Sequence, residues 1–120
     1  MSKVIEITAA EFPERVLQSA LPVLVEFNAL WCPPCKMMAP AFDALAADLG
    51  HQISFVKLDA EEAEELTQHY QVESLPTLVA FKDGQVVARK VGYSSRKDLA
   101  SLLEQLLPCN PPAETLPLPP

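Results

Sequence analysis

The sequence predicts a soluble α/β domain, and three observations support this. Runs rich in Val, Ile and Phe that resemble strands alternate along the chain with segments whose apolar residues recur at helical spacing. The composition is 49% hydrophobic but only 7% aromatic, which fits an α/β domain better than a disordered or disulfide-scaffolded chain. A chain of 120 residues can bury about two-thirds of the surface that it exposes when unfolded, so a single core suffices.

The N-terminal segment predicts a strand followed by a helix. Lys3–Ile7 alternates and contains β-branched residues, which is typical of a strand. Thr8 can then cap a helix that carries Phe12, Val16 and Leu17 on one face.

A second strand and helix flank a pair of cysteines. Val23–Asn28 is almost continuously apolar, which indicates a central strand covered on both faces. Glu26 is an anomaly in this run: its carboxylate either faces solvent or is hidden in the core. Lys36–Leu49 predicts a helix, because apolar residues recur there at helical spacing: Met37, Met38, Ala41, Phe42, Leu45, Ala46 and Leu49.

The next part of the chain predicts three strands and one helix. Ile53–Asp59 has the pattern of a strand, and Glu61–Tyr70 that of a helix with acidic residues near its N-terminus, where negative charge suits the dipole. Thr77–Phe81 and Gln85–Val91 flank the dipeptide Asp83-Gly84, so they are expected to pair as a hairpin.

The C-terminal part predicts a last helix and a tail. Ser94 or Ser95 can cap an amphipathic helix. Its apolar residues are Leu99, Leu102, Leu103, Leu106 and Leu107. From residue 108 onward, six of the last thirteen residues are proline and no apolar face continues. We therefore expect a domain over residues 1–107 and a disordered, proline-rich tail over residues 108–120.

The motif Trp31-Cys32-Pro33-Pro34-Cys35 lies between the predicted strand and helix. Its spacing lets the two sulfurs meet, and the amides and dipole of a helix start stabilise a thiolate on the first cysteine. A Cys-x-x-Cys pair indicates either redox chemistry or metal binding. Zinc is disfavoured because no second such pair exists and the remaining candidates, Cys109, His51 and His69, lack ligand spacing.

The charge and the N-terminus exclude other classes of protein. A net charge of −7 argues against a nucleic-acid surface, which needs clustered Lys and Arg. The N-terminal residues 1–7 lack the apolar stretch of a signal peptide, and nowhere do 18 apolar residues run together. We therefore expect a cytoplasmic chain with no membrane segment. Three cysteines in a reducing compartment do not predict a structural disulfide framework.

Several segments, taken in order, resemble the thioredoxin family over about residues 3–107. They are 23–36 (VLVEFNALWCPPCK), 55–59 (FVKLD), 75–78 (LPTL), 81–84 (FKDG) and 91–92 (VG). The resemblance implies the thioredoxin fold, a three-layer α/β/α arrangement with a central mixed five-stranded sheet flanked by four helices. It also implies that Cys32 is the exposed attacking thiolate and Cys35 the buried thiol that resolves the mixed disulfide.

The same resemblance implies a surface for substrate. Pro76 matches the cis-proline of the family, which faces the cysteines, and the backbone of Leu75 would form β-type hydrogen bonds with an incoming peptide. Trp31, Pro76 and Gly92 would form an apolar docking surface.

Two departures from the family pattern concern the chemistry. Most members carry Gly where this chain has Pro33, which with Pro34 should tune the site, and a buried Asp where it has Glu26. Burial would raise the pKa of Glu26, and such a group suits a base that takes the proton of Cys35. Lys57 would either temper that pKa from the next strand or be a surface lysine.

We therefore predict a protein-disulfide reductase that is monomeric, needs no bound cofactor beyond its own Cys32–Cys35 disulfide, and is recharged by a thioredoxin-reductase-like electron donor. Its substrates would be disulfide-containing proteins. A non-catalytic peptide-binding module is one alternative, but such modules usually lose a cysteine. A thiol oxidase or isomerase is another, but it needs an oxidising compartment.

Overall fold

Strand β2 (Val23–Asn28) lies in the middle of a five-stranded sheet, as its apolar character predicts. The computed structural model describes residues 4–106. The sheet order is β1-β3-β2-β4-β5, with β1 (Val4–Ile7) and β3 (Ser54–Asp59) parallel to β2. β4 (Thr77–Lys82) pairs antiparallel with β2, and β5 (Gln85–Val91) pairs antiparallel with β4. The expected mixed sheet is therefore confirmed.

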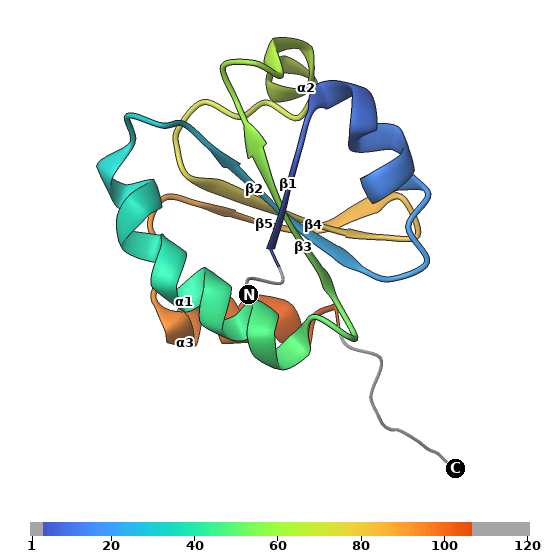
Figure 1. Cartoon of the computed structure of the whole chain (residues 1–120), viewed down its shortest axis with the longest axis vertical. Helices are drawn as coiled ribbons and strands as arrows, with labels where there is room; N and C mark the ends of the chain where they lie inside the picture. Colours follow the sequence, from blue (N-terminus) through green and yellow to red (C-terminus); the bar gives the residue numbers. More distant parts are fainter. Residues whose placement is uncertain (1–3, 107–120) are drawn as a thin grey trace.

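Helices cover both faces of this sheet, which gives three layers (Figure 1). α1 (Pro33–Leu49) and α3 (Arg96–Glu104) pack on one face. The other face is covered by α2 (Glu64–His69) and by an N-terminal helical segment, made of a 3₁₀ turn (η1, Ala9–Glu11) and a π-helical turn (η2, Pro13–Leu17). The architecture is that of the thioredoxin fold.

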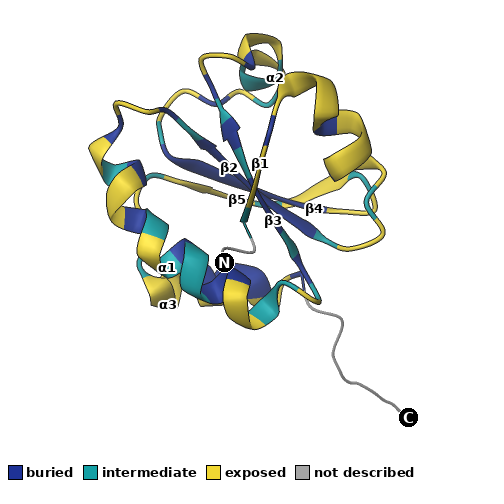
Figure 2. Cartoon of the chain, in the orientation of Figure 1, coloured by how far each residue is buried: buried dark blue, intermediate teal, exposed yellow. Residues whose placement is uncertain are grey.

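The sheet separates two apolar clusters, and Figure 2 shows that the central strands are buried between the layers. Beneath α1 and α3, Leu24 and Leu78 of the sheet meet Met38, Phe42 and Leu99. On the opposite face, the cluster is richer in aromatic rings, with Phe12, Phe27, Tyr70 and Phe81.

The predicted N-terminal helix is wrong in kind and in part of its buried face. Its first turn is 3₁₀ and its second is π-helical, after the amide of Thr8 donates to the Glu11 carboxylate at 2.9 Å. Phe12 and Val16 are buried as expected, whereas Leu17 is 38% exposed. The change of helical pitch carries Leu17 off the face that Val16 shares with the core.

The boundaries of two other helices also differ from prediction. α1 begins at Pro33 rather than Lys36, because prolines are compatible with the first positions of a helix, whose amides have no intrahelical acceptor. α2 begins at Glu64 rather than Glu61, since the Glu61 amide donates to the Asp59 carboxylate at 2.9 Å and residues 60–62 form a turn.

The hairpin and the start of the last helix follow the prediction, whereas α3 ends at Glu104 and leaves Leu106 in the turn after it. Asp83 and Gly84, between β4 and β5, both have positive φ, as a tight hairpin turn requires. Ser95 is the cap of α3, and its hydroxyl accepts from the Asp98 amide at 3.2 Å. None of the helices described between residues 4 and 106 is long and apolar enough to cross a membrane. The predictions for Lys3, Leu107 and residues 108–120, which include Cys109, fall outside the described residues.

Candidate active site

Cys32 and Cys35 form a disulfide at the N-terminus of α1, with Cα atoms 5.3 Å apart. β2 ends at Asn28, and a short loop closed by a hydrogen bond from the Cys32 amide to the Ala29 carbonyl, at 3.3 Å, leads into the helix. Cys32 is the cap residue, and the two prolines that follow occupy the first helical positions, where no donor is needed. The strand and the helix therefore fix both cysteines.

The sulfur of Cys32 accepts a hydrogen bond from the backbone amide of Cys35 at 3.3 Å. Because Pro33 and Pro34 have no amide hydrogen, the Cys35 amide is the first donor available in the helix. The positive end of the helix dipole also points toward Cys32. Both effects favour negative charge on the sulfur of Cys32 over that of Cys35.

The expected exposure of Cys32 is not found in this disulfide-bonded form. Cys32 is 2% exposed and Cys35 is 5% exposed, so the two residues are equally hidden. The sulfurs are bonded to each other, and the pair packs with Ala29 and Leu75.

The segment before β4 reaches the disulfide. Leu75 packs against the cluster formed by Ala29 and the two cysteines, and the peptide bond between Leu75 and Pro76 is cis, as the sequence led us to expect. The Pro76 carbonyl accepts from the Gly92 amide at 2.8 Å. The structure thus brings Leu75, Pro76 and Gly92 together beside the cysteines.

Trp31 is 63% exposed immediately before Cys32. Sequence reasoning missed two further exposed apolar side chains in neighbouring segments: Leu30, which is 84% exposed, and Tyr93, which is 50% exposed. A lone Leu in the loop before the first cysteine and a Tyr directly after Gly92 were the available signals. Exposed large apolar side chains of this kind are typical of a surface that binds another molecule.

Glu26 is 1% exposed, so the alternative of a solvent-facing carboxylate is wrong. Neither of its carboxylate oxygens has a hydrogen-bond partner. Burial raises the pKa of Glu26 from 4.5 to about 7, against the opposing charge of Lys57. The carboxylate of Asp43 on α1 adds to the rise, and the Asn28 amide lowers the pKa slightly, although it forms no hydrogen bond with either oxygen.

Glu26 lies on the face of the sheet that α1 covers. It shares a face of β2 with Leu24, which packs beneath α1 and α3. The charge of Asp43 on α1 acts on its carboxyl group. Glu26 therefore faces the helix that carries Cys35.

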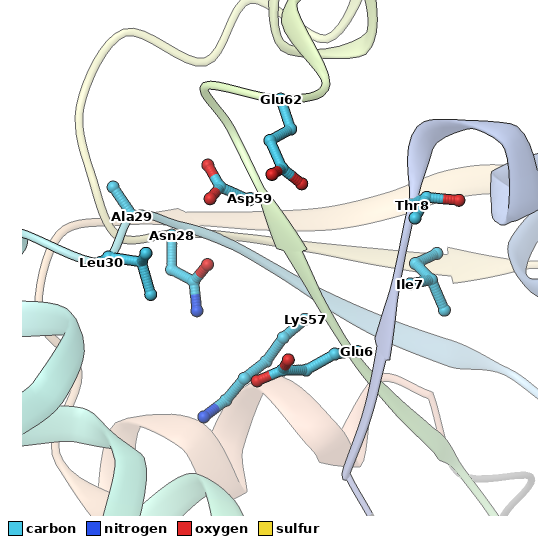
Figure 3. A pocket seen from close by; sticks show the side chains of 9 residues that line it. All are labelled: Glu6, Ile7, Thr8, Asn28, Ala29, Leu30, Lys57, Asp59 and Glu62. Atoms are coloured by element: carbon cyan, nitrogen blue, oxygen red, sulfur yellow. The ribbon is translucent and has the colours of Figure 1, made fainter.

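Lys57 lies opposite Glu26 in the register of β2 with β3, and opposite Glu6 in the register of β1 with β3. It is partly buried and lines a pocket that is open to solvent. Figure 3 shows Lys57, Glu6 and Asn28 around a pocket of about 380 Å³ that Glu26 does not line. Lys57 thus lies between the buried carboxylate of Glu26 and the exposed carboxylate of Glu6. The sequence did not indicate Glu6, because its position beside Lys57 depends on the order of the strands.

Residues 4–106 contain no group of three or more His, Cys, Asp or Glu side chains placed to hold a metal ion. The arrangement at Cys32 and Cys35 is instead that of a dithiol that can close to a disulfide within one helical turn.

Comparison with known proteins agrees with this geometry. The family model described as Thioredoxin matches residues 3–105. Thioredoxin 1 of Synechococcus elongatus is 41% identical over 107 residues, which are 89% of this chain and 100% of the relative. Thioredoxin of Mycobacterium tuberculosis is 42% identical over 107 residues, or 89% of this chain and 92% of the relative.

A third relative has a composite name. The bifunctional thioredoxin reductase/thioredoxin of Mycobacterium leprae is 41% identical over 104 residues, which are 87% of this chain and 23% of that protein. Fold, disulfide and relatives agree, and the chain belongs to the thioredoxin family, as a protein-disulfide reductase that acts by dithiol–disulfide exchange through Cys32 and Cys35.

Proposed function

We propose that Cys32 is the cysteine that attacks substrate and that Cys35 resolves the intermediate. The observation that carries this assignment is the Cys35 amide, which donates to the sulfur of Cys32 at 3.3 Å and leaves the sulfur of Cys35 without an equivalent donor. The Cys32 thiolate attacks one sulfur of the substrate disulfide. A mixed disulfide forms, and the other substrate sulfur leaves as a thiolate that takes a proton from solvent.

Glu26 acts in the second half of the reaction as the proton acceptor for Cys35. Its pKa of about 7 leaves it partly ionised near neutral pH, so it can take a proton and release it again. The Cys35 thiolate then attacks the sulfur of Cys32, the Cys32–Cys35 disulfide forms, and the substrate leaves as a dithiol. Two electrons pass from the enzyme dithiol to the substrate disulfide.

Lys57 tempers this acceptor. Its charge lowers the pKa of Glu26 against the larger effect of burial, and its position beside the pocket gives the buried carboxylate a charged neighbour that reaches solvent. Without Lys57, the pKa of Glu26 would be higher, so less of the carboxylate would be ionised at neutral pH and able to accept a proton from Cys35.

Trp31, Leu75, Pro76 and Gly92 form the docking surface for a polypeptide that carries the disulfide. Support comes from the exposure of Trp31, from the packing of Leu75 against the cluster that contains the cysteines, and from the hydrogen bond that joins Gly92 to Pro76. An extended peptide laid along this backbone would bring its disulfide over Cys32.

The electron donor in this proposal is a thioredoxin-reductase-like enzyme, and disulfide-containing proteins are the acceptors. The reductase/thioredoxin relative in Mycobacterium leprae supports the choice of donor, because one chain there carries both names. We further propose a cytoplasmic monomer that needs no cofactor beyond its own disulfide. Its domain would span residues 1–107, and the family match over residues 3–105 supports leaving the proline-rich residues 108–120 outside it.

Single-cysteine variants test the assignment of the two sulfurs. Cys35→Ser should accumulate a mixed disulfide on Cys32 with a protein substrate such as insulin, because attack survives while resolution is lost. Cys32→Ser should accumulate little under the same conditions. Mass spectrometry after quenching with acid identifies the trapped species, and equal trapping by both variants would reverse the roles.

A further inference from the structure

Arg89 links the edge of the sheet to the segment that leads to Pro76. It lies on β5, where it pairs with Val79 of β4, and its guanidinium group donates to the backbone carbonyls of Tyr70 and Gln71. Both carbonyls belong to the turn that follows α2. Arg89 is 19 residues from Tyr70 and 18 residues from Gln71 in the sequence, so the contact joins two distant parts of the chain.

The turn that Arg89 holds has an unfavourable backbone conformation. Gln71 has φ of 56°, in the left-handed region that non-glycine residues seldom adopt. Within residues 4–106, Asp83 is the other non-glycine residue with positive φ, and the hairpin turn accounts for it. Gln71 directly follows the C-cap of α2, where its amide and that of Val72 donate to the carbonyls of Gln68 and Thr67 at 3.1 and 2.9 Å. The two hydrogen bonds from Arg89 add support from outside the helix.

The same turn is the start of the segment that leads to the docking surface. This segment, residues 71–76, ends at Leu75 and Pro76, and two hydrogen bonds fix its C-terminal end. The Thr77 hydroxyl donates to the Ser74 carbonyl at 2.6 Å, and the Gly92 amide donates to the Pro76 carbonyl at 2.8 Å. β5 and the residue after it thus hold both ends of residues 71–76, with Arg89 at one end and Gly92 at the other.

We propose that Arg89 is a positioning residue for protein substrates, which sets the path of residues 71–76 and so the position of Leu75 beside the cysteines. This inference rests on the proposed docking role of Leu75, Pro76 and Gly92. A planar guanidinium suits the task, because two of its nitrogens donate at once to two consecutive carbonyls. A lysine in its place would present its donors from a single nitrogen.

The central experiment compares protein and small disulfides as substrates of Arg89→Ala. The KM for insulin, with dithiothreitol as electron donor, should rise about five-fold while kcat changes less than about two-fold, since substrate docking is weakened and the cysteines are untouched. The rate constant of the reduced protein with glutathione disulfide should not change. A loss of folded protein would lower kcat instead of raising KM, so this split separates positioning from stability.

Three further variants sharpen the test. Lys90→Ala, next to Arg89 on β5, is the matched control and should keep the KM of the natural chain. Arg89→Lys should raise the KM almost as much as Arg89→Ala. In the Arg89→Ala background, Gln71→Gly should lower the KM again, because glycine adopts positive φ without steric penalty.

Trp31→Ala separates failure of this inference from failure of the docking surface. If Trp31→Ala raises the KM for insulin and Arg89→Ala does not, Arg89 has no positioning role and the docking surface stands. If neither variant raises it, the docking surface itself is wrong. Equal slowing with glutathione disulfide, or no rescue by Gln71→Gly, would also overturn the inference.

Discussion

The two faces of the sheet treat buried polar groups differently. Under η1, η2 and α2, the hydroxyl of buried Thr77 donates to the Ser74 carbonyl, and the rest of that cluster is apolar with packed aromatic rings. Under α1 and α3, Glu26 is buried with both oxygens unpaired. Among residues 4–106, it is the only buried residue with an ionisable carboxyl, ammonium or guanidinium group.

The group that destabilises the fold lies on the same face of the sheet as the active cysteines. An unpaired buried carboxylate is destabilising when it ionises, and this one lies on the face whose helix α1 begins at the active cysteines. The aromatic face carries no such group. Substitutions on the aromatic face should therefore change mainly stability. Substitutions on the face with Glu26 should change mainly the redox chemistry.

The largest effect is expected on the aromatic face. Phe12 is 1% exposed, and its ring centroid lies 5.7 Å from those of both Tyr70 and Phe81. Phe12→Ala should lower the free energy of unfolding by about 3–5 kcal/mol, through lost burial and a cavity. Guanidinium unfolding at pH 5 and pH 8 measures this loss, which should be the same at both values.

Leu17→Ala is the matched control, because Leu17 lies on the same helical segment but is 38% exposed. It should cost less than about 1 kcal/mol. If Phe12→Ala slowed disulfide exchange per folded molecule, the two faces would not be independent and the comparison would fail.

The next largest effect concerns Glu26 and depends on pH. The folded chain raises the pKa of Glu26 from 4.5 to about 7, so between these values it binds a proton that the unfolded chain releases. The associated stability is fully present below pH 4.5 and is lost as pH rises through about 7. At about 1.4 kcal/mol per tenfold change in proton affinity, the loss is about 3 kcal/mol.

Glu26→Leu should abolish this dependence. The free energy of unfolding of the variant minus that of the natural chain should therefore grow by about 3 kcal/mol between pH 4 and pH 8. Urea unfolding across this range measures it, with Glu62→Gln as an exposed carboxylate control. A difference that stays constant with pH would mean that Glu26 keeps an ordinary pKa.

The same carboxylate should matter for one kinetic step. Glu26→Gln should slow resolution of the mixed disulfide by about ten- to hundred-fold and leave the initial attack nearly unchanged, because only resolution requires a proton acceptor near Cys35. Stopped-flow measurement of both phases between pH 6 and pH 8 separates the two steps. Unchanged resolution over this range would remove Glu26 from the mechanism.

Local patterns were sufficient for most of the fold. The apolar run of β2, the dipeptide Asp83-Gly84 and the cap Ser95 each depend on neighbouring residues, and each prediction is confirmed. The start of α2 was wrong because the Asp59 carboxylate binds the Glu61 amide and delays the helix. A competing local hydrogen bond of this kind cannot be distinguished from a helix start by apolar spacing.

The parts of the site that depend on short sequence motifs were predictable. The parts that depend on how the strands pair and which helices cover them were not. Cys32, Cys35 and Pro76 follow from short motifs, and the disulfide and the cis peptide bond agree with them. The burial of Glu26 was left open, since it depends on which strands and helices cover that part of β2. The contact of Arg89 with Gln71 was beyond sequence reasoning, because β5 and the turn meet only in the folded chain.

The smallest effect is expected at Pro33, the first residue of α1, next to Cys32. Pro33 and Pro34 leave the Cys35 amide as the donor to the sulfur of Cys32. Pro33→Gly restores one amide in the first turn of α1, which would favour the Cys32 thiolate and so the reduced form. At about 1 kcal/mol for one hydrogen bond, the reduction potential should become less negative by an amount on the order of tens of millivolts.

Equilibration of both proteins with glutathione buffers measures this difference in potential. Pro34→Ala is the companion variant, because it also restores an amide but at the second helical position, one residue closer to the existing donor. If a missing donor is what matters, both variants should shift the potential in the same direction. Pro33 also holds the loop rigid, since φ is fixed in proline; it lies in the first turn of α1, although a residue that precedes proline usually avoids the α region. A more negative potential in Pro33→Gly would mean that loss of this rigidity outweighs the gained hydrogen bond, and the tuning of the site would then lie in the backbone of the loop rather than in its donors.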